Sequence, residues 1–137
     1  MLASGSPRRR TLLLGLGLDF DVRPPDVDEA VAADEAGTAY VERLARTKAA
    51  VASAPGQVTV AADTTVDLDG QLLGKPTDPA EARALLTRLA GRTHQVHTGV
   101  AVAWWTPAET TAVASEVTTT EVTFSEIPER WMDWYVG

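Results

Sequence analysis

The sequence predicts an α/β or α+β domain built around a mixed sheet. Runs of β-prone residues alternate with amphipathic helical segments along the 137 residues, in the order β–α–β–α–β–β–α–β–β–α. Hydrophobic residues make up 45% of the chain and charged residues 23%, which is typical of a soluble globular protein. Because neither an internal repeat nor a second linker is visible, we expect a single domain over residues 1–137.

The first part of the chain predicts two helices separated by a short strand and a loop. A helix is expected over Arg8–Gly15, closed by its glycine. Asp19–Val22 is expected to form a short strand, and the proline-containing segment Arg23–Asp28 a loop. Apolar residues recur at helical spacing over Thr38–Ala54, which predicts a second helix that stops at Pro55–Gly56.

The middle of the chain predicts a strand followed by a hairpin. Val58–Ala62 is a compact β-prone run. Val66–Leu68 and Gln71–Leu73 flank Asp69–Gly70, a pair of residues that favours the type I′ turn of a hairpin.

The last part of the chain predicts a helix, two long strands and a final helix. Thr77–Pro79 is suited to cap a helix over Ala80–Leu89. Two long β-prone stretches follow, at Thr93–Trp105 and Thr110–Phe124. Glu126–Val136 is expected to form the final helix.

Charge and residue usage exclude several classes of function. The net charge of −7 argues against a nucleic-acid partner, although a small phosphorylated ligand needs only local positive charge. The absence of cysteine excludes disulfides and thiolate metal sites and fits a cytoplasmic protein. With two histidines, any metal would be a hard cation on carboxylates. We expect no membrane partner, since no apolar run is long enough to span a bilayer.

Positive charge gathers at the start of the first helix. Ser6 is a preferred N-cap and Pro7 is favoured at the first helical position, so Arg8–Arg10 fall in the first turn. The helix dipole disfavours cations there. An anion held by helix N–H groups, guanidinium groups and serine hydroxyls, including Ser4, would account for them. A solvated helix end is the open alternative.

Acidic residues suggest a metal ligand or a general base. Asp26, Asp28 and Glu29 follow two prolines in a loop, where carboxylates are usually just solvated but can bind a divalent cation. Asp63 follows the apolar run Val58–Ala62, so we expect it at the carboxyl end of a strand, where α/β proteins place ligand sites. The alternative is an aspartate that forms a turn.

Two lysines are candidates for anion contacts. Lys75 lies between Gly74 and Pro76, where it can act as a point charge on phosphate or simply be exposed. The spacing of a Walker P-loop is absent. Lys48 stands four residues after Leu44 on a mainly apolar helix face, where it either snorkels to solvent or meets an anion.

These residues belong to a set of motifs that stand in one order along the chain. The motifs are residues 2–9 (LASGSPRR), Glu29, residues 44–49 (LARTKA), residues 62–64 (ADT), residues 74–76 (GKP) and residues 91–100 (GRTHQVHTGV). In type and order they resemble the Maf family of nucleoside triphosphate pyrophosphatases. The resemblance covers nearly the whole chain.

The resemblance implies a fold and a reaction. It implies an α/β fold with a mixed, strongly curved sheet and flanking helices, related to the inosine-triphosphatase fold. It also implies hydrolysis between the α- and β-phosphates, giving a nucleoside monophosphate and pyrophosphate, and it suggests a homodimer. Members of the family continue into a further glycine-rich stretch, so we expect this chain to lack the C-terminal portion of the family.

The same resemblance assigns roles to individual residues. Asp63 is implied as the general base that activates water, and Glu29 and Asp63 as ligands of a divalent cation, Mg²⁺ or Mn²⁺. Thr64 and Arg8 occupy positions that are linked to the choice of nucleobase in the substrate. The residues implied in triphosphate binding are Ser4, Arg8, Arg9, Lys48 and Lys75.

The motifs around Asp63 and in residues 94–100 resemble the dTTP/UTP subgroup of the family. The 7-methyl-GTP subgroup tends to have glutamine after the aspartate, where this chain has Thr64. We therefore expect a pyrophosphatase acting on dTTP and UTP, with modified nucleotides as further substrates. The alternatives are a catalytically impaired nucleotide-binding fragment and a 7-methyl-GTP pyrophosphatase.

Overall fold

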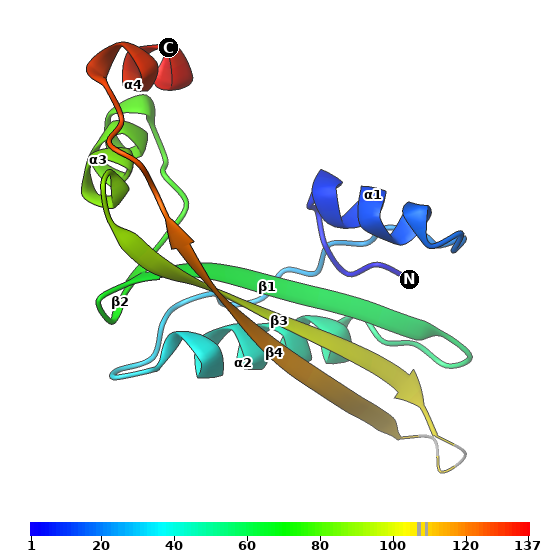
Figure 1. The fold of residues 1–137 in the computed structure, drawn as a ribbon. Helices are drawn as coiled ribbons and strands as arrows, with labels where there is room; N and C mark the ends of the chain where they lie inside the picture. The colour runs from blue at the N-terminus through cyan, green and yellow to red at the C-terminus, as the bar shows by residue number, and fades with distance from the viewer. Residues whose placement is uncertain (107, 109) are drawn as a thin grey trace.

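The computed structural model describes residues 1–106, 108 and 110–137, and shows a four-stranded sheet with helices around it (Figure 1). The elements in chain order are α1 (Pro7–Gly15), α2 (Gly37–Val51), β1 (Val58–Leu68), β2 (Gln71–Leu73), α3 (Pro79–Leu89), β3 (Thr93–Trp105), β4 (Thr111–Thr123) and α4 (Glu129–Val136). The expected combination of a sheet with flanking helices is confirmed.

The strands pair in the order β2-β1-β3-β4, and each of these pairs is antiparallel. Parallel pairing among the described residues is limited to isolated bridges from Leu2 to Val22 and to Val60. The strand expected at Asp19–Val22 is therefore a single bridge. It lies between Gly17 and a pair of prolines, which leaves too little extended chain for a ladder.

β1 is one continuous strand of 11 residues and does not end at Ala62 as expected. Thr64 and Val66 are β-branched and continue the pairing with β3, so the polar Asp63 interrupts the apolar run but not the ladder. Asp63 consequently lies in the middle of β1, opposite Gly99 of β3, and the expectation that it ends a strand is wrong.

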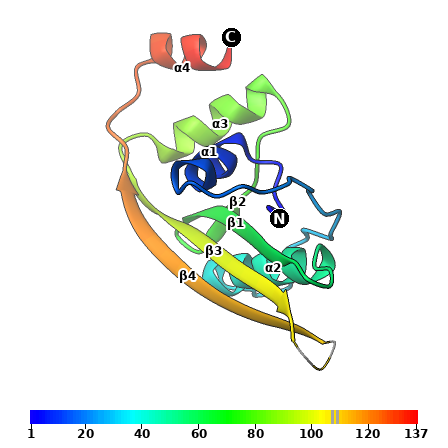
Figure 2. The same ribbon diagram turned by 90° about the vertical axis from the view of Figure 1, so that its right-hand side faces the viewer.

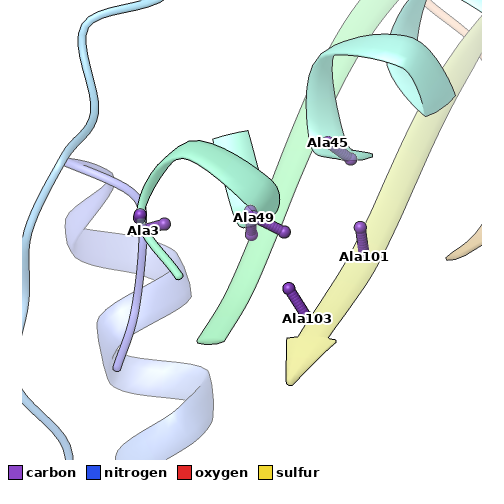
Figure 3. Packing of buried hydrophobic residues seen from close by; sticks show 7 residues of the cluster. Ala3, Ala45, Ala49, Ala101 and Ala103 are labelled. Atoms are coloured by element: carbon purple, nitrogen blue, oxygen red, sulfur yellow. The ribbon is translucent and has the colours of Figure 1, made fainter. Parts of the chain in front are cut away.

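α2 packs closely on one face of the sheet, against β1 and β3 (Figure 1). A Cβ atom at Gly99 would lie 2.5 Å from the backbone oxygen of Val41, so only glycine permits this approach of helix and strand. Small side chains fill the interface, as Figure 3 shows for Ala3, Ala45, Ala49, Ala101 and Ala103. Polar side chains on the inner face of α2 therefore come within reach of β1.

α3 and α4 lie at the other end of the sheet, away from α2 (Figure 2). The Asp78 side chain accepts a 2.7 Å hydrogen bond from the Glu81 amide, which confirms the expected cap of α3. α4 begins at Glu129, after Pro128 in the N-cap position, and not at Glu126. None of the helices described is long and apolar enough to cross a bilayer.

The other helix and turn predictions differ from the structure mainly at their ends. Asp69 and Gly70 both have positive φ, at 54° and 84°, as a type I′ hairpin turn requires. α1 begins at Pro7 with Ser6 in the N-cap position, although the Ser6 hydroxyl makes no capping bond. α2 ends at Val51, three residues before the expected end.

Candidate functional site

A buried lysine lies between two carboxylates at the inner face of α2. Lys48 Nζ lies 2.7 Å from Asp63 Oδ1 and 2.6 Å from Glu29 Oε1. Lys48 and Asp63 are 8% and 9% exposed, whereas the Glu29 side chain is 54% exposed. Lys48 thus meets anions and does not snorkel to solvent, and the cluster is open on the side of Glu29.

The charges in this cluster stabilise one another. The hydrogen bond from Lys48 lowers the pKa of Glu29, and the charges of Lys75 and Arg9 lower it further. Burial is the largest single influence on Lys48 and lowers its pKa, but the hydrogen bonds to Asp63 and Glu29 outweigh burial and raise that pKa overall. Both shifts favour the charged forms, the Glu29 carboxylate and the Lys48 ammonium.

The segment that carries Glu29 is tied to α2. Arg43 Nε lies 2.6 Å from Glu35 Oε1, and Arg43 Nη2 donates to Glu35 Oε2 at 2.7 Å and to the Ala30 carbonyl at 2.9 Å. The Tyr40 hydroxyl donates to the backbone oxygen of Glu29 at 2.9 Å. These contacts hold the Glu29 segment over Lys48 although the segment forms no helix or strand.

Arg9 forms a second cluster on the other side of β1. Its Nη1 donates to the Ala62 carbonyl at 2.7 Å and to Ser4 Oγ at 3.0 Å, and its Nη2 donates to Thr64 Oγ1 at 3.1 Å. Burial lowers the pKa of Arg9, and the charge of Asp63 opposes that shift. The guanidinium therefore joins the start of α1 to the centre of β1.

The position of Ser4 follows from the extended N-terminal segment. The Ala3 amide donates to the Val60 carbonyl at 2.8 Å, and the Val60 amide donates to the Met1 carbonyl at 2.9 Å. These bonds place the segment along the edge of β1. The chain then turns at Ser4, which is buried, and Pro7 starts α1.

The structure brings most of the residues predicted for the site together. Ser4, Arg9 and Thr64 share one hydrogen-bonded network, and Glu29, Lys48 and Asp63 share the other. Lys75 is exposed in the loop after β2, but its charge acts on Glu29. Arg8 is exposed beside Arg9, whose pKa it helps to lower.

Two carboxylates of the site are the kind of group that could hold a divalent cation. Glu29 Oε1 and Asp63 Oδ1 converge on one cationic atom, and carboxylate oxygens are the ligands that Mg²⁺ and Mn²⁺ prefer. No group of three or more His, Cys, Asp or Glu side chains within the described residues could hold a metal. The Asp28 carboxylate instead accepts a hydrogen bond from the Ala30 amide.

Two residues support the site without having been assigned a role from the sequence. Thr98 lies opposite Thr64, and the two hydroxyl oxygens are 3.0 Å apart. Thr98 stands in the motif of residues 91–100, which is the signal in the sequence that marks it. Tyr40 lies within the helix predicted over Thr38–Ala54, and no signal in the sequence indicates that its hydroxyl reaches the backbone oxygen of Glu29.

Comparison with known proteins gives a consistent set of matches. The family model described as Maf-like protein matches residues 1–137. A dTTP/UTP pyrophosphatase of Myxococcus xanthus is 52% identical over 139 residues, covering 100% of this chain and 68% of that protein. A dTTP/UTP pyrophosphatase of Anaeromyxobacter dehalogenans is 48% identical over 140 residues, covering 100% of this chain and 69% of that protein.

Solved structures give weaker likenesses. A HAM1 protein from Coxiella burnetii is 18% identical, with a TM-score of 0.49, covering 88% of this chain and 71% of that one. A nucleoside-triphosphatase (dITP/XTP pyrophosphatase) from Mycobacterium abscessus is 17% identical, with a TM-score of 0.41, covering 88% of this chain and 72% of that one. The assignment of the family rests on the sequence matches.

Proposed function

Because the chain belongs to the Maf-like family, we propose that it is a pyrophosphatase that hydrolyses dTTP and UTP to the monophosphate and pyrophosphate. Two relatives at 48% and 52% identity, each aligned with the whole chain, are named for this activity. The observation that carries the proposal is the contact of the buried Asp63 carboxylate with Lys48, beside the network of Arg9. A carboxylate next to several cations is the arrangement that a triphosphate hydrolase needs.

The basic residues supply charge for the triphosphate. A triphosphate bears about four negative charges, which must be shared among several cations before a nucleophile can approach. Arg9 is held by Ser4 and Thr64, so its guanidinium is fixed before substrate arrives. We place Thr64 beside the nucleobase of the substrate. The residues to which we assign phosphate contacts are Ser4, Arg8, Arg9, Lys48 and Lys75.

Asp63 is the general base of the proposal. It lies in the middle of β1, which pairs with β3, so its backbone is fixed. Lys48 contacts Oδ1 at 2.7 Å, and the other carboxylate oxygen, Oδ2, is the one that we assign to the water. From this position it accepts a proton from the attacking water. A divalent cation on Glu29 and Asp63, when bound, would lower the pKa of water and neutralise phosphate charge.

Product analysis tests the proposal. The protein is incubated with dTTP, UTP, GTP or 7-methyl-GTP and Mn²⁺, and the products are identified by phosphorus NMR. We expect monophosphate and pyrophosphate from dTTP and UTP, and a loss of about 10²- to 10⁴-fold in rate for Asp63→Asn. The same assay with modified pyrimidine nucleotides tests the wider substrate range.

The matched control is Asp69→Asn, because Asp69 lies in the exposed hairpin turn and asparagine tolerates its positive φ of 54°. This variant should keep the activity of the wild type. Orthophosphate as the first product would contradict the proposal. Tight binding of dTTP without any turnover would instead favour a nucleotide-binding protein, and preference for 7-methyl-GTP would assign the other subgroup.

A further inference from the structure

Lys48 occupies the position of a small cation between two carboxylates. Its ammonium nitrogen is 2.6 Å from Glu29 Oε1 and 2.7 Å from Asp63 Oδ1. The Lys48 side chain is 10% exposed and that of Asp63 is 12% exposed. Without a positive charge at this point, the buried Asp63 carboxylate would face the half-exposed Glu29 carboxylate with no counter-ion between them.

We infer that Lys48 is an internal counter-ion that competes with the divalent cation for Glu29 and Asp63, and yields them when metal and nucleotide bind together. This inference rests on the metal dependence of the proposed function. The new point is that, in the free protein, the Lys48 ammonium group fills the position between the two carboxylates that a metal ion would take. Lys48 then moves its ammonium group from the carboxylates to the phosphate oxygens.

Charge repulsion makes the two occupants mutually exclusive. A divalent cation held by Glu29 and Asp63 would stand where the Lys48 nitrogen now lies, and like charges at such a distance repel strongly in a buried site. A lysine has a flexible four-carbon stem, so its ammonium can leave while its Cα stays on α2. The exposed side of Glu29 gives the open path.

The destination of the ammonium links metal binding to nucleotide binding. When the metal binds alone, Lys48 must leave two carboxylates and gains only water. When a triphosphate is present, Lys48 leaves the carboxylates and gains phosphate oxygens. The free protein should therefore bind divalent cations weakly, and nucleotide should strengthen that binding, as linkage between two sites requires.

The first test measures Mn²⁺ binding to the free protein by electron paramagnetic resonance, without nucleotide. Lys48→Met keeps an unbranched apolar stem and removes the ammonium. We expect it to bind Mn²⁺ about tenfold more tightly than the wild type, because no internal cation has to be displaced. Adding Glu29→Gln to Lys48→Met should reverse the gain.

The matched control for this test is Arg46→Met. Arg46 lies on the same helix and loses the same charge, but its side chain is exposed and bonds to Ser115 and Val113 on β4. It should bind Mn²⁺ as the wild type does. An equal gain in both variants would mean that general charge, and not displacement of Lys48, controls the affinity, and would overturn the inference.

A second test uses the wild type and so does not depend on how the variants fold. The chain has two lysines, Lys48 and Lys75, so reductive methylation has two side-chain targets, which peptide mass spectrometry separates from the N-terminal amine. Lys75 is exposed and serves as the internal standard. We expect slow methylation of Lys48 in the free protein and faster methylation at high Mg²⁺, with Lys75 unchanged.

Methylation of Lys48 that stays equally slow at saturating Mg²⁺ would overturn the inference. Release of pyrophosphate from dTTP is measured on the same preparation. If pyrophosphate is released but Lys48 is not displaced, the inference fails and the proposed function stands. If Lys48 is displaced but no pyrophosphate is released, the inference stands and the proposed function fails.

Discussion

Asp63 and Thr64 are neighbours in the chain but serve opposite faces of β1. Successive side chains of a strand point to opposite faces, so Asp63 reaches Lys48 under α2 while Thr64 reaches Arg9. The strand therefore carries a general-base candidate on one face and an anchor for a guanidinium on the other. A change at Thr64 or its partner should act on the Arg9 side alone.

Thr98→Val tests this separation at the level of one hydroxyl. Valine keeps the branched shape but removes the oxygen that lies 3.0 Å from Thr64 Oγ1, so Thr64 and Arg9 lose a fixed partner. A lost hydrogen bond of about 0.5–1.5 kcal/mol predicts a rise in KM for dTTP of about 2- to 10-fold, with kcat little changed. Steady-state kinetics measure both constants.

Thr93→Val is the control for this prediction. Thr93 and Thr123 make a similar hydroxyl pair at 2.7 Å across β3 and β4, at the end of the sheet away from α2. The variant should leave KM unchanged. Equal effects of the two substitutions would mean that Thr98 stabilises the sheet and does not position Arg9.

The residues of the site could be predicted better than their contacts. Arg9 and Lys48 stand in motifs that resemble a known family, and chemistry alone marks them as anion ligands. Their partners are 55 and 15 residues away along the chain, so no local pattern pairs Arg9 with Thr64 or Lys48 with Asp63. Of the two alternatives for Lys48, snorkelling to solvent is wrong and contact with an anion is confirmed, because the fold places two carboxylates beside its ammonium group.

At the scale of elements, the segment before α2 depends on one ion pair. Glu35 is bound through both carboxylate oxygens by Arg43, and it also accepts from the Ala32 amide at 3.0 Å. The hydrogen bond from Arg43 is the main cause that lowers the pKa of Glu35 to about 2. This ion pair fixes the loop that carries Glu29, so its loss should also disturb the position of the Glu29 carboxylate.

Glu35→Gln tests the ion pair through its pH dependence. A carboxyl whose pKa falls on folding stabilises the native state above its unfolded pKa, and that stabilisation is lost as the pH falls toward the folded value of about 2. We expect the variant to have a lower Tm than the wild type at pH 7. The difference should shrink as the pH falls from about 5 to about 3, as thermal unfolding followed by circular dichroism would show.

The partner variant Arg43→Gln sharpens this test. Once Arg43 is absent, adding Glu35→Gln should produce a much smaller pH-dependent difference in Tm, because only the Ala32 amide then lowers the pKa of Glu35. A difference between wild type and Glu35→Gln that is the same at every pH would show that the ion pair does not set the pKa of Glu35.

Local signals predicted the elements that depend on local structure. The hairpin at Asp69–Gly70 and the cap at Asp78 depend on residues a few positions apart, and both are confirmed. The continuity of β1 depends on pairing with β3, which is distant along the chain, so no local pattern shows that the strand continues past the polar Asp63. Tertiary pairing overrides a local break in hydrophobicity.

At the scale of the whole molecule, the candidate site and α4 lie at opposite ends of the sheet. α1 and α2 lie on opposite sides of β1, and α4 packs on α3, away from both (Figures 1 and 2). Met132 is the buried residue of α4, whereas α1 buries none. Few buried contacts imply easy local opening, so both helices should exchange their amide hydrogens faster than α2, β1 and β3.

Nucleotide should change that pattern on one helix only. We expect Asp63→Asn to bind dTTP and to hydrolyse it about 10²- to 10⁴-fold more slowly than the wild type, so hydrogen exchange can be followed by mass spectrometry in the bound state. A ligand that contacts Ser4, Arg8 and Arg9 protects the start of α1, and at ten times its Kd should slow exchange there by about tenfold. α4 touches none of these residues and serves as the internal control. Protection that is equal on α1 and α4, or stronger on α4, would place the nucleotide at the wrong end of the sheet for the site built on Asp63.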